Sequence, residues 1–219
     1  MGSPPLRPAN TTLLRRSLAS AARVLCTVAA VAGTAVLAPQ PALAQTPAAC
    51  PNANDTVDAA GLGAVRTAVG CAVNAIRSEQ RLGELVPSAT LAVAAHRHGI
   101  DMVTRRYFAH VSPSGGTIEK RARRVGYMRG PCWVVGENLG TAVPASASAQ
   151  AIVDAWMASP SHRAIILDPE FRHMGLAVVA GAPIDDPAGA TFVLDVGAND
   201  CDFPAGAARA KVRARVRAG

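Results

Sequence analysis

Three residues in the middle of this 219-residue chain have side chains that can do acid–base or metal chemistry: His110, Glu137 and His162. Two imidazoles and a carboxylate can hold zinc or another divalent metal with positions left open for water. They can also act as acid and base, or position a polar ligand. Because the three residues are far apart in the sequence, their spacing alone does not show that they share one site.

Familiar catalytic motifs are absent from the sequence. It contains no HExxH helix, no phosphate-binding loop and no GxSxG elbow. No Ser or Cys nucleophile is paired with these histidines in a recognisable motif. Hydrolysis would therefore need a water activated by a metal, with Glu137 as the candidate base. Glu137 is the only candidate catalytic residue, and we assign no other.

The elements that must position these residues follow from apolar periodicity and from turn residues. Apolar spacing of three and four predicts a helix from about Thr56 to Arg81, on which Asn74 and Arg77 share a polar face. Ser88 is expected to cap a second helix that runs to about Arg105. The predicted inner face of that second helix consists of Leu91, Ala94, Ala95, His98 and Met102, with His98 as a packed core histidine.

Further elements follow in the second half of the chain. Thr117 is expected to cap a short helix through Arg124, whose Lys and Arg side chains are interpreted as a solvated face. The other predicted elements are a buried strand at 132–135, a helix at 149–158 that Pro160 ends, and strands at 176–180 and 191–196 joined by a hairpin loop. Helices first, followed by strands mixed with helices, favour an α+β layered domain.

The net charge of +7 comes from the two ends of the chain. Residues 1–44 carry four basic residues and residues 205–219 carry five, and neither stretch contains an acid. The remaining 13 Lys and Arg face 15 Asp and Glu, so the body is close to −2. We therefore expect no nucleic-acid partner. The basic C-terminal tail is expected to be disordered and could contact an anionic envelope surface.

The N-terminus has the pattern of an export signal. A basic stretch precedes an apolar run from Val24 to Leu37, and the small-x-small sequence 42–44 predicts cleavage after Ala44. The apolar run is short for a bilayer span, which needs about 20 apolar residues. Arg15 and Arg16 leave twin-arginine export open beside the general route. We therefore expect a secreted, extracellular and monomeric protein.

Five cysteines fit an exported chain. Cys26 would leave with the signal, and the four that remain predict two disulfides. Four cysteines allow three pairings, which spacing does not distinguish. We favour Cys50 with Cys71, which would tie an N-terminal arm to the first helix, and Cys132 with Cys201, which would tie the C-terminal segment to the body.

Six short motifs occur together in a fixed order between Val69 and Gly197. They are Asn74-x-x-Arg77, His98-Gly-Ile-Asp101-Met102, Phe108-Ala-His110, Gly136-Glu137-Asn138-Leu139, Trp156-Met-x-Ser159-Pro160-x-His162-Arg163 and Met174-Gly175-Leu176. In order and spacing they resemble the CAP superfamily (cysteine-rich secretory proteins, antigen 5, pathogenesis-related 1) in its short bacterial secreted form. With the export signal and the basic tail, the resemblance predicts a signal peptide at 1–44, an N-terminal arm and helix start at 45–68, a CAP domain at 69–203 and a basic tail at 204–219.

The resemblance also implies an α-β-α sandwich with a small antiparallel sheet between helical layers. It implies a cleft lined by two His and two Glu, which here would be His110, His162 and Glu137. The second Glu position falls at Ser159, which is not acidic, so mechanisms that need paired carboxylates are weakened. The two histidines remain candidate ligands for zinc or another divalent metal.

Two functional classes stay open. The resemblance favours a non-catalytic extracellular binding module for a small or lipid-like ligand, because similar domains are linked to sterol and lipid binding. The alternative is a metal-assisted, protease-like hydrolase that uses the two histidines and Glu137.

Overall fold

A mixed sheet separates two layers of helices in the computed structural model, which describes residues 50–130, 132–184, 188–199 and 213–214. The sheet has the strand order β1-β3-β4-β2-β5. Its strands are β1 (Val86–Pro87), β2 (Trp133–Ala142), β3 (His173–Ala180), β4 (Ala190–Asn199) and β5 (Arg213–Ala214). The helices are α1 (Val57–Ala60), α2 (Leu62–Glu79), α3 (Ala89–Arg105), α4 (Ile118–Arg124), the 3₁₀ turn η1 (Pro144–Ser146), α5 (Ala149–Ala158) and α6 (Pro160–Ile166).

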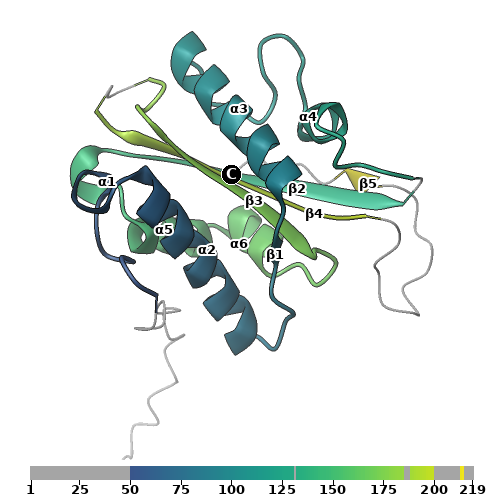
Figure 1. Ribbon diagram of the computed structural model, residues 1–219, viewed down its shortest axis with the longest axis horizontal. Coiled ribbons are helices and arrows are strands. Elements are labelled where there is room, and N and C mark those ends of the chain that lie inside the picture. Colours follow the sequence, from purple (N-terminus) through teal and green to yellow (C-terminus); the bar gives the residue numbers. More distant parts are fainter. Residues whose placement is uncertain (1–49, 131, 185–187, 200–212, 215–219) are drawn as a thin grey trace, which may run out of the picture. The chain divides into compact units, whose positions relative to one another are not determined.

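The three long strands form the centre of the sheet and are antiparallel to one another. β2 pairs with β4, and β4 pairs with β3 through the hairpin predicted from the sequence. The two-residue strands β1 and β5 add parallel pairs at the edges. Helices α3 and α4 lie on one side of this sheet, and α2, α5 and α6 lie on the other (Figure 1). The α-β-α sandwich expected from the resemblance is therefore confirmed.

Side-chain caps set the start of three helices, as Ser and Thr do when their oxygens accept from the orphan N–H groups of the first turn. The hydroxyl of Ser88 accepts from the Leu91 N–H, and that of Thr117 accepts from the Lys120 N–H, which confirms both predicted caps. The first predicted helix is divided into α1 and α2 at Gly61, whose φ of 81° lies outside the helical range. Pro160 follows α5 as predicted and also begins α6.

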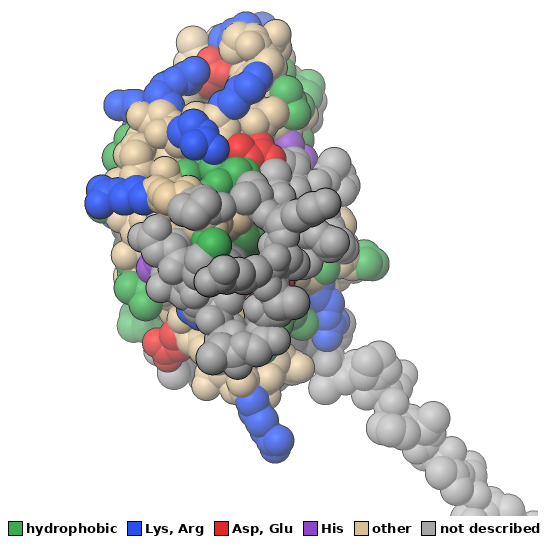
Figure 2. Space-filling model, turned by 90° about the vertical axis from the view of Figure 1, so that its right-hand side faces the viewer, with side chains coloured by type: hydrophobic (Ala, Val, Ile, Leu, Met, Phe, Trp, Pro, Cys, Tyr) green, Lys and Arg blue, Asp and Glu red, His purple; other side chains and the backbone are tan. Residues whose placement is uncertain are grey.

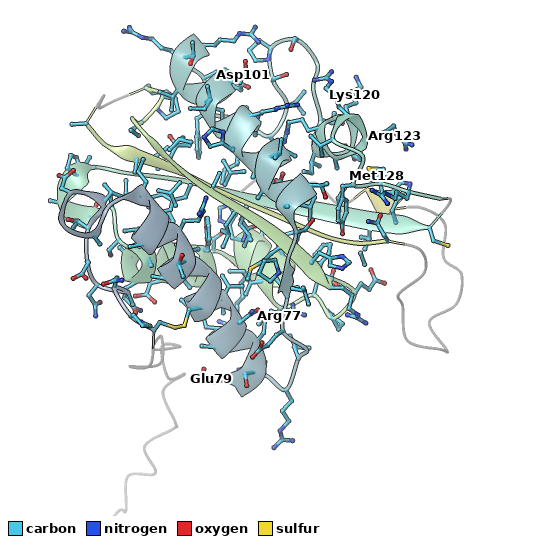
Figure 3. The ribbon with its side chains drawn as sticks, in the orientation of Figure 1. Arg77, Glu79, Asp101, Lys120, Arg123 and Met128 are labelled. Atoms are coloured by element: carbon cyan, nitrogen blue, oxygen red, sulfur yellow. A yellow bond between two sulfur atoms is a disulfide. The ribbon has the colours of Figure 1, made fainter. Side chains whose placement is uncertain are left out.

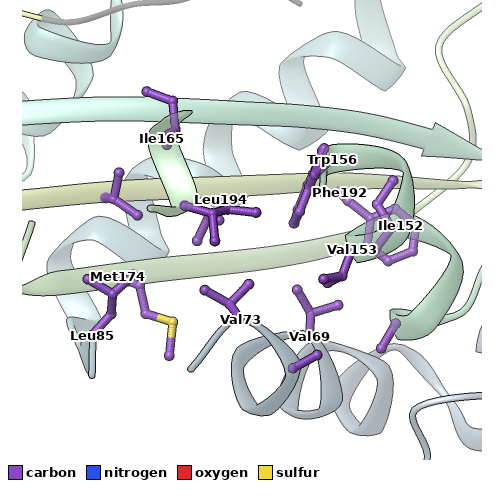
Figure 4. Packing of buried hydrophobic residues seen from close by; sticks show 14 of the residues in the cluster. Val69, Val73, Leu85, Ile152, Val153, Trp156, Ile165, Met174, Phe192 and Leu194 are labelled. Carbon is purple, nitrogen blue, oxygen red and sulfur yellow. The ribbon is translucent and has the colours of Figure 1, made fainter. Parts of the chain in front are cut away.

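The larger core lies between the sheet and the layer formed by α2, α5 and α6 (Figure 4). Trp156 from α5 and Phe192 from β4 are almost completely buried there, and the Trp156 indole N–H donates to the Leu139 carbonyl at 2.9 Å. On the opposite face, α3 lies directly against β3. A Cβ at Gly175 would lie 2.1 Å from the Leu91 carbonyl carbon, so only glycine permits this contact.

The two residues predicted to share a polar face of the first helix, Asn74 and Arg77, hold the chain that follows α2 in place. Arg77 is fully buried and donates to four carbonyls, those of Gly83, Ile166, Asp168 and Phe171. Asn74 exchanges two hydrogen bonds with the backbone of Leu85, at 2.8 and 3.1 Å. The polar face that these two residues share is therefore covered by the chain that follows α2.

The predicted disulfides, the export signal and the basic tail lie toward the two ends of the chain, and the structure describes them only in part. Cys50 and Cys71 form the predicted disulfide, with their Cα atoms 5.8 Å apart. Cys132 is also disulfide-bonded, and its predicted partner, Cys201, lies outside the described residues, as do the export signal and most of the basic tail. Within the tail, Arg213 and Ala214 form β5, so the expected disorder does not hold for these two residues. In the described part of the chain, no helix is long and apolar enough to span a bilayer.

Candidate functional site

Glu137 is the centre of a buried polar cluster. It lies in the middle of β2, and its side chain is fully buried on the face covered by α3 and α4. His110 Nδ1 donates to Glu137 Oε1 at 2.8 Å, and Arg121 Nη2 donates to Glu137 Oε2. Burial alone would raise the pKa of Glu137, but the His110 hydrogen bond and the Arg121 charge outweigh it and lower that pKa. Glu137 is therefore an ionised carboxylate with both oxygens engaged.

The position of Glu137 corrects one sequence prediction. The apolar run at 132–135 predicted a short strand that ended before Glu137. Instead, β2 continues to Ala142, and it pairs with β4 residue by residue along this length. The register to β4 supplies the backbone hydrogen bonds that extend the strand, and this pairing is not visible in the local sequence.

Arg121 joins the cluster from α4. Its guanidinium also donates through Nη1 to the carbonyls of His110 and Gly116, at 3.0 and 2.8 Å. The prediction that the basic side chains of this helix form a solvated face is therefore wrong for Arg121, which is 8% exposed. Helical spacing could have found it, since Arg121 is three residues from the buried Ile118 and next to the buried Ala122.

His98 is both a packed histidine, as predicted, and a neighbour of Glu137. Its Nε2 lies 3.1 Å from the Ala109 carbonyl oxygen and 3.9 Å from Glu137 Oε2. Burial lowers the pKa of His98, and the charge of Glu137 opposes this shift only in part. A neutral imidazole is the form that suits this buried position.

Asp195 is the residue that the sequence interpretation missed. It lies directly opposite Glu137 in the β2–β4 register and is fully buried. Neither of its oxygens accepts a hydrogen bond from a described donor. Burial, and then the charge of Glu137, raise the pKa of Asp195 well above its ordinary value. A signal was present, since Asp195 interrupts the apolar run 192–196 at a position where a buried strand normally carries a hydrophobic side chain.

His162 is presented by α6, on the other helical layer. Asn138, also on β2, donates to the His162 carbonyl at 3.0 Å and so holds the first turn of α6 against the strand. The His162 ring is half-buried, and its pKa is lowered by burial and then by the charge of His110.

Ser159 precedes α6, and its hydroxyl lies 3.2 Å from that of Ser161. Because this residue is a serine, no acidic side chain lies at this position, where the resemblance implied a second Glu. Among the residues that the structure describes, no group of three or more His, Cys, Asp or Glu is arranged to hold a metal ion. The polar cluster and the two histidines thus offer at most a pair of imidazole ligands, because both oxygens of Glu137 are engaged.

The arrangement and the sequence agree with a known family. Residues 71–195 match the CAP family, described as the cysteine-rich secretory protein family. The match covers more than half of the chain, and the protein belongs to this family.

Two curated relatives come from Bacillus subtilis (strain 168). Uncharacterized protein YkwD is 31% identical over 150 residues, which is 67% of this chain and 55% of YkwD. Uncharacterized membrane protein YlbC is 29% identical over 107 residues, which is 48% of this chain and 29% of YlbC. The chain therefore spans about half, or less, of the length of these relatives.

Two solved structures share the fold. An extracellular protein containing an SCP domain from Bacillus anthracis str. Ames is 25% identical with a TM-score of 0.50, over 61% of this chain and 41% of that chain. An outer surface protein from Borrelia burgdorferi is 19% identical with a TM-score of 0.51, over 59% of this chain and 88% of that chain. The second likeness bears on the fold alone.

Proposed function

We propose that this protein is an exported CAP-domain binding module that holds a small or lipid-like ligand near His110 and His162 without turning it over. The observation that carries this proposal is the state of Glu137. It is fully buried, and Arg121 and His110 occupy its two oxygens. A general base must reach the proton that it removes. Glu137 instead orients the His110 ring, which is the role of a positioning residue.

Binding is tested with a fluorescent fatty acid and a fluorescent sterol titrated into the purified protein. A saturable signal that His110→Ala and His162→Ala each weaken about tenfold is expected, because both rings are near the proposed ligand. His96 is an exposed histidine on α3, so His96→Ala serves as the matched control and should bind as the wild type does. Binding that is unchanged in both ring variants would place the ligand elsewhere.

Export of this chain is part of the same proposal. The extracellular SCP-domain neighbour from Bacillus anthracis and the Cys50–Cys71 disulfide both support it, since disulfides persist in oxidising compartments. Sequencing the N-terminus of protein recovered from culture medium should give Gln45 first. A protein that starts at Met1 in the medium would contradict the cleavage. Replacing Arg15 and Arg16 with Lys would stop export only on the twin-arginine route.

A divalent metal held by His110 and His162 is the second candidate. Its support is that the bond from His110 Nδ1 to Glu137 leaves the other ring nitrogen for a ligand, which is the usual setting of a metal-binding histidine. The lowered pKa of His162 favours the neutral ring that a metal needs. Calorimetric titration with zinc should show one site that the double variant His110→Ala/His162→Ala loses. Identical isotherms for the wild type and the double variant would rule out this metal site, and with it the metal-assisted hydrolase.

The basic tail at 204–219 is proposed to contact an anionic surface. Five cations in 15 residues can bind anionic lipid or polymer. Vesicles with and without anionic lipid, mixed with the full chain and with a chain that ends at residue 203, separate a tail effect from an effect of the domain. Equal binding by both chains would contradict the role of the tail.

A further inference from the structure

A cavity of about 460 Å³ lies between α3 and α4, with the loop Ser112–Gly116 in its wall. The charged residues that line it are Arg97 and Asp101 on α3 and Lys120, Arg121 and Arg124 on α4. Because Glu137 pairs with Arg121, the other three cations and Asp101 leave a formal charge of +2, without His98. Figure 3 labels Asp101 on α3 and Lys120 on α4. Figure 2 shows Lys and Arg side chains, in blue, gathered in the upper part of the molecule, at the height of these two helices.

The single carboxylate does not neutralise these cations. Asp101 accepts from the Tyr107 hydroxyl and lies 3.5 Å from Arg105, which is outside the cavity lining. Among the described residues, Arg97 and Arg124 have neither a hydrogen-bond partner nor an ion-pair partner. Their neighbour Arg123 differs, since its guanidinium lies over the Trp133 ring at 5.8 Å. Arg97 and Arg124 thus both line the cavity with guanidinium groups that no described side chain neutralises.

The charges on α4 also repel one another. Lys120 and Arg124 are four residues apart and share one face of the helix, where like charges destabilise it. Arg121 lies between them, and its buried Nε–H has no acceptor among the described residues. An anion in the cavity would relieve this repulsion, because it would face positive charge from both helices at once.

The wall of the cavity is held in place by its own hydrogen bonds. Ser112 Oγ accepts from the Gly116 N–H at 2.9 Å, and Lys120 Nζ donates to the Gly115 carbonyl at 2.8 Å. A Cβ at Gly116 would lie 2.8 Å from Ser112 Oγ, so glycine is required for this closure. The Ser114 hydroxyl, also in the lining, is hydrogen-bonded to that of Ser112 at 3.0 Å.

We propose that this cavity binds a phosphate group, carried by a soluble small molecule or by a lipid headgroup, between Arg97 and Arg124. The guanidinium group matches the oxygens of a phosphate through paired N–H donors, and the two arginines approach from different helices. The excess of two positive charges suits a phosphate better than a single carboxylate. This site does not depend on ligand binding at His110 and His162, so either proposal can fail alone.

Calorimetric titration at low salt, first with inorganic phosphate and then with glycerol phosphate, tests the proposal. One site per chain is expected, weakened by sodium chloride. Arg97→Gln and Arg124→Gln should each weaken binding about tenfold, since each removes charge-assisted hydrogen bonds. Arg123→Gln is the matched control, with the same change of charge on the same helix, and should bind within about twofold of the wild type.

Vesicles of phosphatidylglycerol and of phosphatidylcholine distinguish the two sources of phosphate. Retention on the phosphatidylglycerol vesicles that Arg124→Gln abolishes, without affinity for glycerol phosphate, would identify a lipid headgroup. Melting temperatures show whether each variant is folded, and added phosphate should raise that of the wild type. Absence of binding to every probe, acetate that binds as tightly as phosphate, or equal losses in Arg123→Gln and Arg124→Gln would each overturn the proposal.

Discussion

Glu137 on β2 and Asp195 on β4 lie directly opposite each other, and both side chains are fully buried. Burial and the charge of Glu137 raise the pKa of Asp195, whereas His110 and Arg121 lower the pKa of Glu137 against the effect of its burial. Two adjacent buried carboxylates ionise together only at a large cost in free energy. The pair therefore carries one negative charge, on Glu137, and one proton, on Asp195.

Asp195→Asn is expected to stabilise the protein at neutral pH. A folded-state pKa above the unfolded value of about 3.9 means that wild-type stability from this group is present below that value and is lost as pH rises toward the folded pKa. Asn has no such proton to lose. The variant should therefore gain stability relative to the wild type as pH rises from about 4 to neutral, measured by urea unfolding. If the difference in unfolding free energy between variant and wild type stays constant over this pH range, Asp195 does not carry a proton in the folded protein.

Arg121→Met should cost about 3–5 kcal/mol of unfolding free energy, because it leaves the buried Glu137 charge without its guanidinium. Arg123→Met, on the same helix, loses only its contact with the Trp133 ring and should cost at most about 1 kcal/mol. Urea unfolding of both variants gives the comparison.

The double variant Arg121→Met/Glu137→Met separates charge from packing at the same place. It should recover most of the lost stability, since replacing both partners of a buried ion pair with apolar side chains is often neutral. A double variant as unstable as Arg121→Met would show that packing, and not the unpaired charge, causes the loss.

Arg77→Met should cost about 3 kcal/mol or more, since four carbonyls, three of them in buried hydrogen bonds, lose their donor. Arg66→Met is the matched control, because Arg66 is an exposed residue of the same helix, and it should change stability by less than about 0.5 kcal/mol. Thermal unfolding of the two variants would decide. Equal effects would mean that the Arg77 bonds contribute little.

His98 and His162 should both titrate below the ordinary histidine pKa of about 6.5, which NMR of the ring carbons can follow. Because their folded pKa values are lowered, the unfolded chain binds protons more readily, and stability is lost as pH falls from about 6.5 through the lower folded pKa values. Burial is the main cause for each ring.

His110→Asn tests the approach of the two rings. It removes the charge that adds to the shift of His162, so the pKa of His162 should rise toward its ordinary value. A His162 titration that does not move would show that the rings lie beyond electrostatic reach of each other, which would also argue against a shared metal.

Much of the scaffold was predictable from local signals. The Ser88 and Thr117 caps, the inner face of α3 and the full extent of α5 follow from side-chain chemistry within one or two helical turns. These features depend on neighbours in the sequence, which periodicity and capping rules describe. The length of β2 was not predictable in this way, because its second half depends on the partner strand.

The sequence by itself determined the family motifs, the candidate residues His110, Glu137 and His162, and the helices that carry two of the cluster's members, His98 and Arg121. Only the tertiary structure decided what these residues do. The register of β2 on β4 places Asp195 opposite Glu137, and the docking of α4 turns Arg121 inward to pair with it. The physical reason is that burial and charge pairing arise between segments far apart in the chain, where a change of one residue in strand register would face every side chain the other way.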